Sequence, residues 1–207
     1  MHRFFRIVRN IFIDPRDPPV LEEESYPRDS MGRPELKRFT KPLSHYIGYM
    51  EDYHQALGPA GPTDPAWQSF AYRKGVLAQW GMIAKGPSEA LPYVLGLLES
   101  PLPEARSAAA GIIGEWRKDD SFIPHLVSAL EKEDDIETLS TLAGALGRLK
   151  ARAALPRLAA LLRAPNSDEG DLSWSVIEAV SAIAGRDFMS TADPKRATDN
   201  WLAEQGV

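Results

Sequence analysis

The sequence contains no cysteine among its 207 residues. Disulfide bonds, cysteine-ligated zinc, iron–sulfur clusters and thiol nucleophiles are therefore excluded. No stretch approaches the roughly 18 uncharged apolar residues that a membrane-spanning helix requires. Basic residues are also few, because 24 Lys and Arg stand against 29 Asp and Glu and give a net charge of −5. This balance argues against a protein that grips nucleic-acid phosphates, since that function needs a dense excess of Lys and Arg.

The first thirteen residues form a short basic amphipathic segment. On a helical wheel its apolar side chains gather on one arc, and Arg3, Arg6 and Arg9 lie on the other. The pattern predicts a helix over residues 1–13 that docks onto a partner protein or a membrane surface. The alternative is a helix that caps the open end of the protein's own fold. The residues predicted to carry the docking are Phe4, Phe5, Arg6, Val8, Arg9, Ile11 and Phe12.

Residues 14–41 show little apolar periodicity and contain five prolines. Proline removes a backbone donor and disfavours helix in the residue before it, so the segment is predicted to be an irregular, proline-rich tether. From residue 42 onward apolar side chains recur at helical spacing, and no strand-like alternation of useful length appears. Residues 42–207 are therefore predicted to be all-α.

An internal repeat indicates how these helices are arranged. Gly81, Gly114 and Gly147 are spaced by 33 residues, and three Leu-Pro or Ile-Pro pairs recur every 32. Each unit thus holds two helices with one apolar stripe, which neighbouring pairs must cover by stacking. Gly111 and Gly144 are expected to let neighbouring helices approach closely. The sequence predicts an α-solenoid with helix pairs over 42–85, 88–118, 121–150 and 152–185, and a C-terminal capping helix over 194–205.

The repeat resembles the HEAT repeat, specifically the short bacterial variety found in phycobilisome lyases. The resemblance rests on Ala90-Leu91-Pro92, on the stretch from Glu104 to Gly114 and on its echo that ends at Gly147. It implies a HEAT-like superhelix and a structural role for Arg73 and Arg106 in bonding to neighbouring loops. It also implies an alternative function as a bilin-lyase-like or chaperone-type assembly factor. A nucleic-acid-binding solenoid is a third reading, which the acidic balance disfavours.

The surface of the second helices opposite their buried stripe is predicted to be a concave binding face. Trp174 is its strongest residue, because an exposed tryptophan is a frequent interface anchor. The alternative is that Trp174 packs into the long loop 164–171. The residues predicted to line the face are Ser107, Glu137, Thr141, Arg148, Trp174 and Glu178.

No catalytic, metal or cofactor site is predicted. His45 and His54 are nine residues apart and point to opposite sides of one helix, which makes a shared metal site improbable. Asp119, Asp120 and the acidic run 131–137 are interpreted as acids that oppose the positive dipole end of a helix, with attraction of a basic partner or, more weakly, of a divalent cation as the alternatives. The sequence therefore predicts a non-enzymatic scaffold, adaptor or accessory subunit that binds protein rather than nucleic acid, in the cytoplasm or at the inner face of a membrane.

Overall fold

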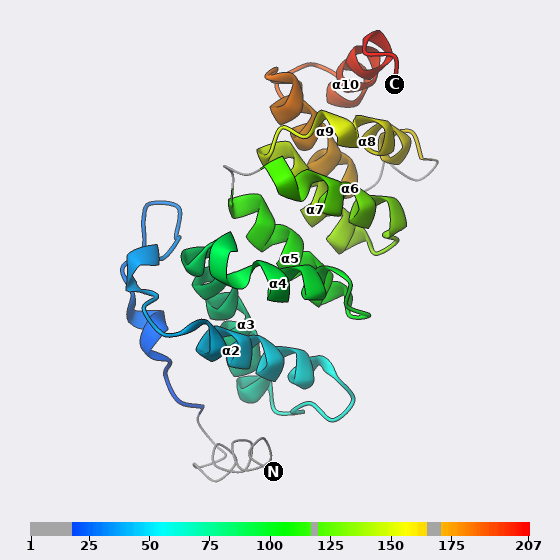
Figure 1. Ribbon diagram of the computed structural model, residues 1–207. Helices are drawn as coiled ribbons and strands as arrows, with labels where there is room; N and C mark the ends of the chain where they lie inside the picture. Colours follow the sequence, from blue (N-terminus) through cyan, green and yellow to red (C-terminus); the bar gives the residue numbers. More distant parts are fainter. Residues whose placement is uncertain (1–17, 117–119, 165–170) are drawn as a thin grey trace. The chain divides into compact units, whose positions relative to one another are not determined.

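The computed structural model describes residues 18–116, 120–164 and 171–207 (Figure 1). The chain forms two compact units, one up to residue 85 and one over residues 86–207. The described residues contain nine α-helices and four short 3-10 turns. They contain no β-strand, and a single isolated bridge joins Arg28 to Pro34. None of the described helices is both long and apolar enough to cross a bilayer.

The helices form the predicted pairs. In the first unit α2 (Leu43–Leu57) packs against α3 (Pro65–Lys85). The second unit contains α4 (Pro87–Leu98) with α5 (Pro103–Glu115), α6 (Ile123–Lys132) with α7 (Ile136–Arg148), and α8 (Leu155–Leu162) with α9 (Asp171–Ala184). The terminal helix α10 (Pro194–Glu204) packs on α8 and α9. These elements confirm an all-α fold made of the predicted helix pairs, with a solenoid of three pairs and a C-terminal cap in the second unit.

Proline marks the start of most helices, because its missing N–H has no intrahelical partner in the first turn. The 3-10 turns Asp120–Phe122 and Arg152–Ala154 precede α6 and α8, and proline follows at the second helical position. Helix α4 begins at Pro87, one residue before the predicted start of its pair at residue 88. It runs through Pro92, the repeat proline of this pair. The turn before the repeat proline is thus α-helical in this pair.

The core of residues 86–207 lies between a layer of first helices (α4, α6, α8) and a layer of second helices (α5, α7, α9). Helix α7 packs between α5 and α9. The predicted apolar stripes of the second helices all lie in this core. The buried residues are Ala105, Ala109, Ile112, Ile113 and Trp116 on α5; Leu139, Leu142, Ala143 and Leu146 on α7; and Val176, Ala179, Val180 and Ile183 on α9.

Two repeat glycines allow the second helices to approach one another closely. A Cβ atom on Gly114 would lie 2.9 Å from Ala145 Cα, and one on Gly147 would lie 2.7 Å from Ala179 Cα. The expectation that Gly144 plays this role is wrong, because a Cβ there would meet only the guanidinium of Arg148, at 3.5 Å. Gly114 and Gly147 thus mark close contacts of α5 with α7 and of α7 with α9, whereas a Cβ on Gly81 would meet the Tyr46 ring of α2.

A buried ion pair links the loops at one end of this layer. Arg106 donates from Nε and Nη2 to the Glu133 carboxylate, at 2.7 Å in both cases. Its Nη1 donates to the carbonyl oxygens of Ser100 and Pro101. Only 3% of the Glu133 side chain is exposed. Arg106 therefore ties the α4–α5 loop to the α6–α7 loop, which is the structural role that the resemblance implies.

Residues 18–41 belong to the segment predicted to be a tether. They form the 3-10 turns Glu22–Ser25 and Leu36–Arg38 and otherwise extended backbone. The side chains of Leu21 and Phe39 are buried, whereas those of Val20, Met31 and Leu36 are exposed. The centre of the Phe39 ring lies 5.8 Å from that of Tyr46 on α2. This part of the segment is therefore a strap on the first helix pair. The boundaries predicted at residues 13 and 41 stay predictions.

The strap is held by a buried carboxylate. The Glu23 side chain is 1% exposed, and its oxygens lie 2.9 Å from His45 Nε2 and 3.4 Å from the Tyr49 hydroxyl that donates to it. Burial, reinforced by the negative charge of Glu23, raises the pKa of Tyr49, so this phenol stays a donor. An ion pair of 2.9 Å between Arg73 on α3 and Glu24 adds to the attachment, whereas the pair of Lys41 with Glu22, also at 2.9 Å, joins two parts of the strap itself.

Replacing Glu23 by alanine is expected to release the strap. His45 and Tyr49 would lose their buried acceptor, which leaves polar groups without hydrogen bonds. Amide hydrogen exchange over residues 20–40 should accelerate about tenfold or more. The control is Glu22→Ala, because the neighbouring Glu22 side chain is 64% exposed and its ion pair with Lys41 contributes little. Equal exchange rates in the two variants would show that Glu23 does not hold the strap.

Candidate protein-binding face

The second helices of residues 86–207 present one continuous surface on the side away from the first helices. We call this surface the second-helix face. It consists of side chains that follow each helix at intervals of three or four residues, opposite the buried stripe. Its members are Glu104, Ser107 and Gly111 on α5; Glu137, Thr141, Gly144 and Arg148 on α7; and Trp174 and Glu178 on α9. All six residues predicted from the sequence belong to it.

The middle of the second-helix face is shallow. Ser107 and Thr141 lie on neighbouring helices, and their hydroxyl oxygens are 2.9 Å apart. Thr141 also donates to the carbonyl oxygen of Glu137, one turn earlier in its own helix. Gly111 and Gly144 have no side chains, so nothing at these positions projects beyond the short side chains of Ser107 and Thr141. A partner's backbone can therefore come close to the helices here.

Arg148 lies at one end of the face and is engaged within the fold. Its Nε lies 3.3 Å from the Gly114 carbonyl oxygen, to which it donates, and 3.7 Å from a carboxylate oxygen of Glu115. Arg148 thus bridges α7 to the end of α5. The structure keeps this predicted residue on the face but gives it a structural contact.

Trp174 is the largest apolar side chain on the face, and 50% of it is exposed. It lies one turn before Glu178, which is also exposed, on the outward side of α9. The alternative contact of Trp174 with loop 164–171 falls mostly on residues 165–170, which lie outside the described part of the chain. This alternative stays a prediction.

The sequence prediction omitted Glu104. This residue is exposed on α5 and stands 33 residues before Glu137, at the same position of the repeat. The 33-residue repeat spacing from Glu137 could therefore have identified Glu104 as a residue of the face. With Glu104 each of the three second helices contributes one exposed acid to the face.

The residues predicted to dock through the amphipathic N-terminus lie outside the described residues. They are Phe4, Phe5, Arg6, Val8, Arg9, Ile11 and Phe12. Among the described residues, no three His, Asp or Glu side chains are grouped closely enough to hold a metal ion. In the acidic run, Asp135 caps α7 by accepting from Thr138 N, and Glu133 is paired with Arg106. Asp135 at the N-cap and Glu137 in the first turn lie at the positive dipole end of α7, as the dipole interpretation expects.

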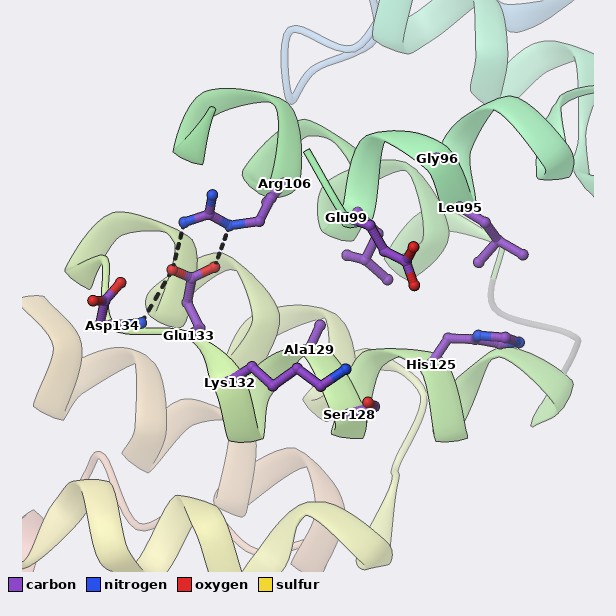
Figure 2. A pocket seen from close by; sticks show the side chains of 11 residues that line it. Leu95, Gly96, Glu99, Arg106, His125, Ser128, Ala129, Lys132, Glu133 and Asp134 are labelled. Atoms are coloured by element: carbon purple, nitrogen blue, oxygen red, sulfur yellow. Dashed lines mark hydrogen bonds and ion pairs between the residues drawn. The ribbon is translucent and has the colours of Figure 1, made fainter. Parts of the chain in front are cut away.

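Sequence reasoning missed a groove between the first helices α4 and α6 (Figure 2). Its volume is about 750 Å³. Leu95 and Glu99 line it from α4, His125 and Lys132 from α6, and the pair of Arg106 with Glu133 stands at one end. Acids, bases and apolar side chains alternate along it, so the groove has no single complementary charge. No periodic signal marks it in the sequence, because it arises from the separation of two helices.

The groove and the glycine contacts together describe the curvature of this unit. The first helices α4 and α6 stand apart, whereas α5, α7 and α9 touch at Gly114 and Gly147. A row of helix pairs that is spread on one side and tight on the other bends toward the tight side. This spacing favours the second-helix face as the inner one, which stays a prediction.

Comparison with known proteins finds a similarity over part of the chain. Residues 91–171 match the sequence profile described as HEAT repeats. This stretch includes most of α4, all of α5 to α8 and the first residue of α9. No curated protein matches the chain. The narrower resemblance to phycobilisome lyases stays a prediction. The match supports a HEAT-repeat protein, a class whose repeats generally mediate protein–protein interaction.

Proposed function

We propose that the protein is a non-enzymatic scaffold or adaptor that binds a protein partner through the second-helix face, as an accessory subunit of a larger complex. The observation that carries the proposal is the half-exposed Trp174 beside a shallow strip of small side chains. Tryptophan is enriched among the few residues that supply most of the affinity of an interface. The low strip around Ser107 and Thr141 gives a partner room to cover the indole.

The amphipathic N-terminus is a second attachment point in this proposal. Leu21 and Phe39 of the strap already cover apolar surface of the first helix pair. A cap on that pair is thus supplied in part by the strap, which supports a role for residues 2–13 in docking elsewhere. We place the protein in the cytoplasm, where this segment docks on its partner or on the inner face of a membrane. A short helix of this kind is marginal alone in water and gains order on docking.

Replacing Trp174 by alanine is expected to remove the partner captured by the full-length protein from native lysate. Loss of a central aromatic anchor costs about 2 kcal/mol or more, which is roughly a thirtyfold loss of affinity. Half of the indole already lies outside the core, so the thermal melting temperature should change little. The measurement is a quantitative pull-down from soluble and membrane fractions.

The control for this experiment is Tyr72→Ala, because Tyr72 is an exposed aromatic of the other unit, with 60% of its surface accessible. It should capture the same proteins as the unmodified chain. A chain that lacks residues 1–13 forms the third arm, and loss of capture there assigns a share of the binding to the N-terminus. Identical capture by the Trp174 and Tyr72 variants would contradict binding at the second-helix face.

A further inference from the structure

The charge that the second-helix face offers to a partner is negative. Glu104, Glu137 and Glu178 are exposed, one on each helix. The basic residues of the same helices already have carboxylate partners, since Arg106 pairs with Glu133 and Arg148 lies beside Glu115. Helix α9 contains no Lys or Arg. The whole unit has the same tendency, because residues 86–207 hold 19 of the 29 acidic residues and 12 of the 24 basic ones.

The hydroxyl groups at the centre of the face are acceptors for a partner. Thr141 directs its proton to the Glu137 carbonyl oxygen, 3.1 Å away. The Ser107 hydroxyl then donates to Thr141 Oγ1 across the 2.9 Å contact. Each oxygen keeps at least one lone pair that these two hydrogen bonds do not use. Carboxylates and hydroxyls alike therefore call for hydrogen-bond donors on the partner.

The repeat also sets a spacing. Glu104 and Glu137 occupy equivalent positions on neighbouring helices, whose axes in close packing are about 8–10 Å apart. Three residues of an extended chain span about 10 Å. A segment that crosses the helices in extended form would thus bring a basic side chain to each helix if every third residue were Lys or Arg.

We propose that the second-helix face binds an extended basic segment of a partner protein, with arginine or lysine at about every third residue and apolar contact on Trp174. The proposal rests on the proposed function, because it names the partner chemistry of the same face. Exposed apolar surface at Trp174 provides the contact, and charge complementarity with the three acids identifies the occupant. The same charge repels nucleic-acid phosphates.

The test uses the full-length protein and a fluorescein-labelled synthetic peptide of twelve residues with arginine at every third position and serine or valine between. A second peptide has glutamate in place of each arginine. Fluorescence anisotropy should show binding of the arginine peptide only, with affinity that falls as NaCl is raised from 50 to 200 mM. Glu137→Lys combined with Glu178→Lys should weaken binding about tenfold.

The matched control combines Glu131→Lys with Glu204→Lys, which alters the net charge equally at exposed positions off the face. Circular dichroism confirms that both variants are folded. Equal weakening by the two variants, or no binding of the arginine peptide, would overturn the proposal. If Trp174→Ala abolishes capture from lysate while the Glu137 and Glu178 reversal leaves it intact, the binding face stands and the basic partner is wrong.

Discussion

Replacing Arg106 by alanine is expected to lower the free energy of unfolding of the second unit by about 3–5 kcal/mol. The guanidinium makes two hydrogen bonds to Glu133 and two to backbone carbonyl oxygens. Its loss leaves a carboxylate that is 97% buried without its counter-charge. An uncompensated buried charge costs far more than the net value of the intact pair, which is why this single change has a large effect.

Urea unfolding followed by circular dichroism measures this change, and hydrogen exchange of the α5 and α7 amides assigns it to the second unit. The control is Arg163→Ala. Arg163 also pairs with a carboxylate, Asp199, at 2.6 Å, but both side chains are more than 40% exposed. An exposed pair contributes at most about 1 kcal/mol. Similar losses in the two variants would mean that burial of Glu133 is not the source of the effect.

The same pair predicts a loss of stability in acid. Hydrogen bonds from Arg106, assisted by the Asp134 and Asp135 backbone N–H groups, hold the pKa of Glu133 below its ordinary value. A carboxyl whose pKa is depressed by folding stabilises the protein above its unfolded pKa of about 4.3 and loses this contribution as the pH falls through the folded value. In Arg106→Ala this acid-dependent part should shrink, because the main cause of the depressed pKa is gone.

A double replacement separates charge from packing. Arg106→Met with Glu133→Leu removes both charges and keeps apolar volume, so its stability should lie closer to that of the unmodified protein than Arg106→Ala does. A double variant that is less stable than Arg106→Ala would show that the link between the loops, rather than the unpaired charge, dominates the loss.

Replacing Gly147 by alanine is expected to destabilise the second unit by about 1–3 kcal/mol, although alanine is the better helix former. The new Cβ would lie 2.7 Å from Ala179 Cα, which is backbone and cannot rotate away. Helices α7 and α9 would have to separate, and the packing contacts between them would weaken.

Gly144→Ala in the same helix is the matched control. Its nearest neighbour is the mobile end of Arg148, at 3.5 Å, so the substitution should be neutral or stabilise by up to about 1 kcal/mol. Urea unfolding of both variants should therefore give free energies that differ by about 1–4 kcal/mol. Equal stabilities would show that α7 and α9 are not in close contact at Gly147.

The sequence determined the architecture because stacked repeats make equivalent contacts, and these require the same residue types at a fixed spacing along the chain. The 33-residue spacing of Gly114 and Gly147, with apolar stripes at helical intervals, predicted the helix pairs and their buried sides. The same periodicity placed Ser107, Thr141 and Trp174 on one face, since a residue opposite a buried stripe must point outward. Each of these inferences needs only neighbours within a helix or at the equivalent position of the next repeat.

Other features were decided only by the tertiary structure, because they depend on contacts between residues that do not recur at the repeat spacing. The pairing of Arg106 with Glu133, the attachment of the strap through Glu23 and the groove between α4 and α6 are of this kind. So is the choice of Gly147 over Gly144 as the point of contact with α9. These features depend on distances in three dimensions. The sequence alone does not specify which side chain, far away along the chain, pairs with a buried charge or packs against a ring.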